Sequence, residues 1–356
     1  MQILTWLTTR TRDINNKPEI RYTKPIYIMS STQKPIGIFY EHPEWFKPLF
    51  AELERRNLPY ARINAAEHRF NPADTEVPFS IVINRMSSSA YLRDHVQGIF
   101  HTTNYLTHVE SLGVPVINGV NAQTIESSKS KQLTLFSRLD LPYPRTRVVN
   151  HVSQILPAAL ELRFPIVVKV NIGGSGAGII RFDTREGLEQ AIANNQINLG
   201  IDYTALVQEF IPARDGHIVR IETLNGKFLY SIKVYTTGES FNLCPAEICQ
   251  VPDPTDPQAC LVDAPKKGIR VEAYEPPTAI IEEVEKLVQA AKLDVGGIEY
   301  LVDNNGQHYF YDINALSNFV ADAVNIVGFD PYKSFVDYIE QRLQLAYALE
   351  KKLALL

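Results

Sequence analysis

The sequence predicts an α/β protein with α+β character, in which a parallel-sheet domain is joined to a strand-rich C-terminal part. Strands alternate with helices over residues 35–120, which is typical of a parallel sheet. Three successive strands follow residue 204, and a hairpin with an Asn-Gly turn lies near residue 305, which favours antiparallel pairing in this part. The chain therefore divides into an N-terminal extension (1–34), an α/β domain (35–120), a central part (121–200) and a C-terminal part (201–356).

Composition excludes several classes of protein. The 356-residue chain is 45% hydrophobic and has a formal net charge of −5, whereas a non-specific nucleic-acid binder normally has a basic surface. No stretch approaches the roughly 20 apolar residues of a membrane span, and the first residues lack the basic region of a secretory signal. Cys244, Cys249 and Cys260 show no Cys-x-x-Cys spacing and are expected to be reduced thiols. We expect a cytoplasmic protein with no nucleic-acid or membrane partner.

The N-terminal domain begins with a strand at 36–40. A helix is predicted over 45–56 because Phe46, Leu49, Phe50 and Leu53 follow helical spacing. The remaining elements are expected to be strands at 60–63, 79–84 and 114–118 and a helix at 91–112.

The central part contains a glycine-rich loop that directly follows a buried strand. Helices are predicted over 127–139 and 153–162, and strands over 145–149 and 165–170. The last strand carries Lys169 near its end, and the loop contains Gly173, Gly174, Ser175 and Gly176. Glycines let backbone N–H groups converge on an anion while a lysine neutralises phosphate charge, so the loop is a candidate phosphate site. A flexible hairpin loop is the alternative. The order matches neither the Walker nor the Rossmann pattern, because the lysine comes first and a strand follows.

Three strands are predicted at 204–211, 217–224 and 227–235, with Asn225-Gly226 as a tight turn. Arg220 and Lys233 lie on the last two strands, where either one would hold a phosphoryl group or form a surface salt bridge. The first strand ends in Gln208, Glu209, Phe210 and Ile211, whose backbone atoms at a strand end could bond a nucleobase edge. A purely structural role for this stretch is the alternative.

A helix over 280–291 leads into the C-terminal hairpin, and a closing helix is predicted over 331–352. If Asn305-Gly306 is a two-residue turn, Glu299 faces Asp312, and Asn314 lies on the same side of the sheet. Two carboxylates and an amide oxygen on one face form a site suited to Mg²⁺. A solvated acidic strand face is the alternative reading.

The order of these features resembles the ATP-grasp superfamily over residues 35–340: two lysines, a glycine loop, a nucleobase edge, an arginine and a carboxylate pair with an asparagine. The chain is most similar to the RimK-like group of carboxylate–amine ligases, which includes glutamate ligase, glutathione synthetase and D-Ala–D-Ala ligase types. Residues 129–146 match the family's lysine-bearing helix, with Ser128 where the family often has Asp. Either Lys129 or Lys131 could be the lysine that binds the nucleotide in this family, and the spacing to Thr146 favours Lys129. The resemblance implies an ATP-grasp fold preceded by a parallel-sheet domain.

The resemblance also implies roles for individual residues. Lys129, Lys169 and the glycine loop would bind the ATP phosphates, residues 208–211 would clamp adenine, and Asp215 would contact ribose. Arg220 and Lys233 would be catalytic, and the metal ligands would be Glu299, Asp312 and Asn314, whose acid order is swapped relative to the family. Arg85, Ser317 and Asn318 would line the substrate site, with Arg93 as a weaker match.

The activity implied is ATP-dependent amide or peptide bond formation through an acyl phosphate, with release of ADP and phosphate. The cofactors implied are ATP and two Mg²⁺ ions, with Mn²⁺ as an alternative. The substrates implied are a small carboxylate and an amine, and an amino acid or small peptide is expected among them. A small-molecule kinase of the same fold and a non-catalytic nucleotide-binding protein are the competing hypotheses. A homodimer is expected by resemblance and because dimers are the commonest oligomers.

Overall fold

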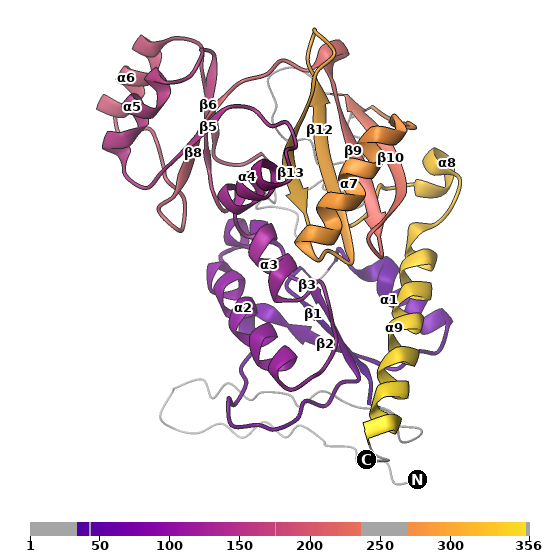
Figure 1. Ribbon diagram of the computed structural model, residues 1–356. Helices are drawn as coiled ribbons and strands as arrows, with labels where there is room; N and C mark the ends of the chain where they lie inside the picture. Colours follow the sequence, from indigo (N-terminus) through magenta and orange to yellow (C-terminus); the bar gives the residue numbers. More distant parts are fainter. Residues whose placement is uncertain (1–33, 43, 175, 236–269, 354–356) are drawn as a thin grey trace, which may run out of the picture.

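The computed structural model describes residues 34–42, 44–174, 176–235 and 270–353, and it contains three separate β-sheets (Figure 1). Residues 1–33 of the N-terminal extension, Ser175 and the three cysteines lie outside the described residues. The predicted mixture of a parallel sheet with antiparallel sheets is confirmed.

The N-terminal sheet is parallel and lies between two layers of helices. Its strands run in the order β2 (Tyr60–Asn64), β1 (Ile36–Tyr40), β3 (Ile81–Arg85) and β4 (Val116–Ile117). Helix α2 (Val96–Ser111) packs against one face, and α1 (Lys47–Arg55) packs with α9 (Pro331–Leu353) against the other. The closing helix therefore returns to the first domain of the chain, as Figure 1 shows. The helix predicted over 91–112 is divided into a 3₁₀ turn, η2 (Ser88–Arg93), and α2.

The central part contains an antiparallel sheet in the order β5 (Thr146–Val149), β8 (Ala205–Glu209), β6 (Ile166–Val170) and β7 (Ile179–Phe182). Helices α5 (Ile155–Leu160) and α6 (Arg185–Ala193) cover one face of it through a shared apolar cluster. Two further helices, α3 (Val120–Glu126) and α4 (Lys129–Arg138), connect this part to the N-terminal domain. The sequence predicted α4 but not α3 or α6.

The C-terminal sheet is antiparallel, in the order β11 (Val271–Ala273), β10 (Lys227–Tyr235), β9 (His217–Leu224), β12 (Val295–Val302) and β13 (His308–Asn314). Helix α7 (Thr278–Ala291) packs on one face. The short helix α8 (Ala323–Val327) follows the sheet. Asn225 and Gly226 have φ values of 53° and 71°, as a two-residue hairpin turn requires, so this predicted turn is confirmed.

The C-terminal hairpin pairs Glu299 with Asp312 as predicted, but the predicted turn is wrong. The Asp303 N–H donates to the Gln307 carbonyl, so the loop has three residues, 304–306, and Gly306 adopts a φ of 86°. The pairing then runs one residue out of the predicted register, with Val302 opposite His308. An extra residue between Phe310 and Asp312 forms a β-bulge and restores the predicted pairing at Glu299.

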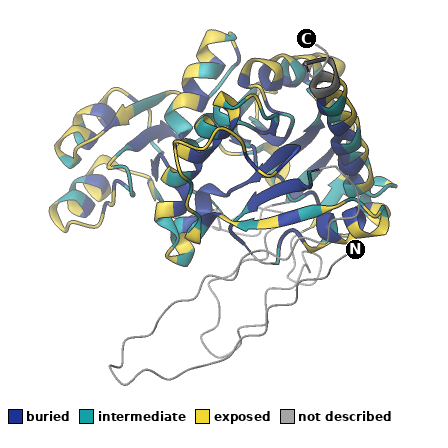
Figure 2. Ribbon diagram, turned by 90° about the horizontal axis from the view of Figure 1, so that it is seen from below, coloured by how far each residue is buried: buried dark blue, intermediate teal, exposed yellow. Residues whose placement is uncertain are grey.

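The strands at the centre of the molecule are buried, while the surrounding helices turn an exposed side outward (Figure 2). None of the helices in the described part of the chain is both long enough and apolar enough to cross a membrane.

Candidate active site

Two opposed carboxylates form the centre of the candidate site. Glu299 on β12 and Asp312 on β13 are register partners, and Asn314 Nδ2 lies 3.4 Å from Glu299 Oε1. Burial raises the pKa of Glu299, while the Arg220 guanidinium opposes that rise and the charge of Asp312 adds to it. Such close carboxylates need cations between or beside them to stay ionised.

Two lysines converge on these carboxylates from other elements. Lys129, at the start of α4, forms an ion pair with Asp312. Burial alone would lower the pKa of Lys129, but the Asp312 carboxylate outweighs it and the pKa is raised. Lys169, near the end of β6, is 6% exposed, and its burial, together with the nearby charge of Lys129, lowers its pKa to about 7. An anion between the two ammonium groups would relieve this repulsion.

Asn171 holds the two lysine-bearing segments together. Its Oδ1 accepts from the Ser130 N–H at 2.8 Å, and its backbone carbonyl accepts from the Lys129 N–H at 3.1 Å. Ser128 caps α4 by accepting from the Lys131 N–H, which is a role that an aspartate would also fill. Lys131 itself is exposed, so the structure brings Lys129 and not its rival to the carboxylates.

Arg220 lies between two buried carboxylates on the same face of the sheet. Its Nε is 2.6 Å from Glu222, its Nη1 is 2.8 Å from Glu299, and its Nη2 donates to Ser317 Oγ at 3.2 Å. The guanidinium lies across Gly297, where an added Cβ would come within 2.5 Å of Nη2. Glycine at this position therefore lets Arg220 lie flat beside Glu299.

The structure does not bring Lys233 to this cluster. Lys233 is opposite Val219, whereas Arg220 is opposite Ile232, so the two side chains point to opposite faces of the sheet. The Lys233 ammonium lies 4.5 Å from the centre of the Tyr274 ring, on the face that α7 covers. The expected catalytic role of Lys233 therefore does not fit this geometry, because the sheet lies between the Lys233 side chain and Glu299.

The glycine loop touches the N-terminal domain. A Cβ at Gly174 would lie 2.8 Å from the Cβ of Ser89, which follows β3 in η2. Gly173 packs against Val170, and Gly176 adopts a φ of 72°. The loop thus lies between Lys169 and the carboxyl end of the parallel sheet.

The predicted nucleobase edge lies at the end of β8. The Gln208 side chain donates to Thr146 Oγ1 at 2.7 Å, and the buried carboxylate of Glu209 forms ion pairs with Arg145 and Arg163. The Phe210 ring lies 4.3 Å from the Arg181 guanidinium carbon. These side chains are engaged with protein, and the backbone N–H groups of Glu209 and Phe210 also donate to the carbonyls of Arg145 and Pro165. Ile211 is half-buried, and Asp215 is exposed in the loop before β9.

Arg85 is buried at the end of β3. It donates to the backbone carbonyl of Ser317, and its Nη2 lies 3.4 Å from Asn318 Oδ1. Burial lowers the pKa of Arg85 to about 10. The three residues expected to line the substrate site therefore do lie together.

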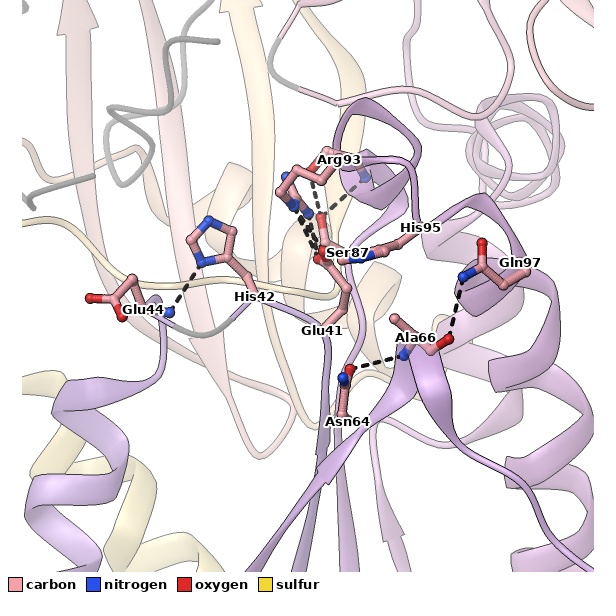
Figure 3. Close-up of polar contacts among 10 residues, drawn as sticks. Glu41, His42, Glu44, Asn64, Ala66, Ser87, Arg93, His95 and Gln97 are labelled. Atoms are coloured by element: carbon pink, nitrogen blue, oxygen red, sulfur yellow. Dashed lines mark hydrogen bonds and ion pairs between the residues drawn. The ribbon is translucent and has the colours of Figure 1, made fainter. Parts of the chain in front are cut away.

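Arg93 is already paired at the end of β1. Figure 3 shows the Glu41 carboxylate between Arg93 and His95, at 2.6 Å from Arg93 Nη2 and 2.6 Å from His95 Nδ1. Burial alone would raise the pKa of Glu41, but these hydrogen bonds lower it. Arg93 therefore fixes the loop beside η2, which also places Ser89 near the glycine loop.

The donor set fits magnesium. Within the described ranges, no group of three His, Cys, Asp or Glu side chains is placed to hold a metal ion. Glu299 and Asp312 with the Asn314 amide supply hard oxygen atoms, and Mg²⁺ commonly completes its shell with water and phosphate oxygens. Lys129 and Arg220 now neutralise the same carboxylates that would hold the ion.

Sequence reasoning missed Asn171, Glu222, Ser89 and the buried carboxylate of Glu126. Glu126 accepts from the Ala315 N–H at 2.5 Å just beyond Asn314, and burial raises its pKa. A glutamate two residues after Arg220 on a strand predicts a shared face, which was the one signal available for Glu222.

Comparison with known proteins agrees with this arrangement. Residues 126–242 match the family model of the RimK-like ATP-grasp domain. Over these residues the chain is similar to a RimK-like ATP-grasp domain. This match begins just before α4 and ends beyond β10, so it includes Lys129, Lys169, the glycine loop and Arg220.

The curated relatives match about half of this chain. A probable α-L-glutamate ligase 1 from Shewanella amazonensis is 28% identical over 177 residues, which is 49% of this chain and 55% of the relative. A probable α-L-glutamate ligase 2 from Shewanella denitrificans shows the same identity and coverage. The chain thus spans about half the length of the curated relatives that it matches.

Solved structures extend the likeness to nearly the whole described fold. A RimK domain protein from Sphaerobacter thermophilus has a TM-score of 0.60 at 16% identity, covering 85% of this chain and 98% of that one. D-cycloserine synthetase DcsG has a TM-score of 0.63 at 14% identity, with 86% and 99% covered. The ligase PsnB, solved with Mg and ADP, has a TM-score of 0.62 at 14% identity, with 88% and 100% covered. At these identities the likeness shows the ATP-grasp fold, and that predicted fold is confirmed.

Proposed function

We propose that this protein is an ATP-dependent carboxylate–amine ligase that forms an amide or peptide bond through an acyl phosphate and releases ADP and phosphate. The observation that carries the proposal is the convergence of four segments on one sheet face: Lys129, Lys169, Arg220 and the Glu299–Asp312 pair. Its likeness to proteins named as ligases supports the same class of reaction.

The side chains divide the work of phosphoryl transfer. Lys129 and Lys169 hold the phosphates of ATP, and Arg220 stabilises the charge that develops on the transferred phosphoryl group. Glu299, Asp312 and Asn314 would hold Mg²⁺, which would supply positive charge to offset the phosphate oxygens. The glycine loop beside Ser89 excludes water, which would otherwise hydrolyse the acyl phosphate.

The direct test is ADP release with ATP and Mg²⁺ across pooled amino acids and dipeptides, given singly and in pairs. A ligase produces ADP in quantity only when a carboxylate and an amine are both present. A single compound that suffices and yields a stable phosphorylated product would favour the kinase, and ATP binding without turnover would favour the non-catalytic protein.

Asp312→Asn and Lys169→Ala are expected to abolish ADP release while the protein stays folded. Glu283→Gln is the matched control, because Glu283 pairs with His308 at the other end of the same hairpin strand. Wild-type turnover in Asp312→Asn or Lys169→Ala would refute the assignment of these residues. Gel filtration with light scattering would test the expected homodimer.

A further inference from the structure

The region next to Arg220 contains buried charges whose hydrogen bonds are incomplete. Glu222 is 1% exposed and Arg85 is 2% exposed. Among the described residues, Glu222 Oε2 has no hydrogen-bond partner, and neither has Arg85 Nε or Nη1. Arg85 and Glu222 each have other partners, but a buried polar atom left without one is costly, so these three atoms indicate a missing ligand of complementary charge.

The two residues lie close to each other and to the proposed chemistry. Glu222 is among the charges that act on Arg85, and its other oxygen accepts from Arg220 Nε at 2.6 Å. Glu222 lies two residues from Arg220 on the same face of β9. A group bound to Glu222 Oε2 would therefore lie beside Arg220, which stabilises the transferred phosphoryl group in the proposed reaction.

A cavity of about 190 Å³ lies between α1 and the segment after β13, and its lining reaches Asn318, the neighbour of Arg85. Asn318 connects the two, because it lines the cavity and also faces Arg85 at 3.4 Å, a contact long enough to be given up readily. Tyr332 lines the cavity as well, and its hydroxyl donates to the Asn318 carbonyl at 2.8 Å.

The lining of this cavity is apolar and acidic. Trp45, Phe319 and Val324 supply apolar surface, while Asp322 and Asp330 supply negative charge. No Lys, Arg or His is present among the described residues that line it. Such a wall accepts an uncharged apolar side chain and repels a carboxylate.

We propose that the amine substrate is a free α-amino acid with an apolar side chain, whose ammonium group binds Glu222, whose carboxylate binds Arg85 and whose side chain fills this cavity. The proposal rests on the ligase function and specifies its acceptor. It departs from the glutamate named in the matched relatives, since glutamate would place a second carboxylate against Asp322 and Asp330.

Glu222 would also take part in the transfer. The ammonium gives one proton to Glu222 Oε2, and the neutral amine then attacks the acyl carbon. The C–N bond forms as the bond from that carbon to the phosphate oxygen breaks, and the second amine proton leaves on the phosphate.

Binding and turnover of two probes, phenylalanine and glutamate, test the proposal. Calorimetry in the presence of Mg²⁺ and a non-hydrolysable ATP analogue is expected to show phenylalanine binding roughly tenfold more tightly than glutamate. The methyl ester and the N-acetyl derivative of phenylalanine should each bind more weakly. Equal or better binding of glutamate, or no binding of either amino acid, would overturn the proposal and leave water as the partner of these charges.

Glu222→Gln separates the role of the charge from that of the fold. The glutamine oxygen still accepts from Arg220, so we expect the KM for phenylalanine to rise roughly 10- to 100-fold, the range of one charged hydrogen bond. The KM for ATP should stay unchanged. Glu52→Gln is the control, because Glu52 is also a buried carboxylate and pairs with Arg55 and Arg56 at the end of α1. An unchanged KM for phenylalanine in Glu222→Gln would overturn the assignment.

A gain of specificity provides a second test. Val324 is 59% exposed at the cavity, so Val324→Arg adds a cation at little cost to the fold and should let glutamate bind, whereas Val324→Gln should not. If no pair of substrates produces ADP but phenylalanine still binds through Glu222, the ligase function fails and the site stands. ADP release with glutamate or peptide amines instead would refute only the site.

Discussion

Replacing Gly297 by alanine tests whether the flat position of Arg220 matters. An alanine Cβ would lie 2.5 Å from Arg220 Nη2 and 2.8 Å from both Cζ and Nε. Ordinary van der Waals contact needs roughly 3.5 Å or more. The guanidinium must therefore move by up to about 1 Å, because the Cβ is fixed to the backbone of a central strand.

Arg220 cannot make this movement and keep its bonds. Its contacts to Glu222 and Glu299 are 2.6 Å and 2.8 Å long, and a charged hydrogen bond contributes about 1.5–3 kcal/mol. A displacement of about 1 Å in a positioned group can reduce a rate about 100-fold. We therefore expect Gly297→Ala to lower kcat for ADP release about 100-fold while the sheet stays folded, since φ at this position is not positive.

Steady-state ADP release and circular dichroism would measure the two effects separately. Gly187→Ala in α6 is the matched control, because the nearest atom to its added Cβ is Thr184 Oγ1 at 3.6 Å. That variant should keep its kcat and gain up to about 1 kcal/mol of stability from its helix propensity. A kcat for Gly297→Ala within about threefold of wild type would refute the reasoning about Arg220.

Three further predictions follow from other contacts. Gly174→Ala should raise the KM for ATP because its Cβ would meet Ser89, and adding Ser89→Gly should restore that KM; no rescue would disprove the contact. Burial, with the neighbouring His101, lowers the pKa of His68 to about 4, so the unfolded state binds more protons between about pH 6.5 and 4. The free energy of unfolding should therefore decrease as the pH is lowered through that window, and less steeply in His68→Phe. Equal pH dependence of the two proteins in urea titrations would contradict this. Lys169 has a folded pKa of about 7, below its unfolded value near 10.5, so stability should rise between those pH values in the wild type and not in Lys169→Met.

Most of the regular elements could be predicted from the sequence because their apolar spacing and turn residues are local signals. The strands of the parallel sheet, the turn at Asn225-Gly226 and helix α7 all occur where the pattern places them. The short elements α3, α6 and β11 were missed, since a few turns of helix or three strand residues carry little periodicity.

The candidate site was partly predictable for a different reason. Charged residues at strand ends are conspicuous, so Lys169, Arg220 and Asp312 could be selected from the sequence. Asn171 could not, because its importance comes from the start of α4, which folding brings to it. Glu222 had only its two-residue spacing from Arg220 as a signal. The missing information is tertiary contact rather than residue type.

Single-residue bulges decided the two remaining outcomes. In the C-terminal hairpin the longer turn and the bulge before Asp312 each shift the register by one residue in opposite senses, so the predicted Glu299–Asp312 pair survives. In the β9–β10 hairpin the turn is as predicted, but a bulge between Phe228 and Tyr230 shifts the register once. Without that bulge Lys233 would face Ile218, on the same side as Arg220; with it, Lys233 faces Val219 and turns away. Because side chains alternate between faces, one extra residue moves a lysine across the sheet, and neither bulge has a signal as strong as Asn-Gly. The predicted face of a site residue on a strand is therefore correct only if the number of residues between it and the nearest turn, bulges included, is predicted correctly.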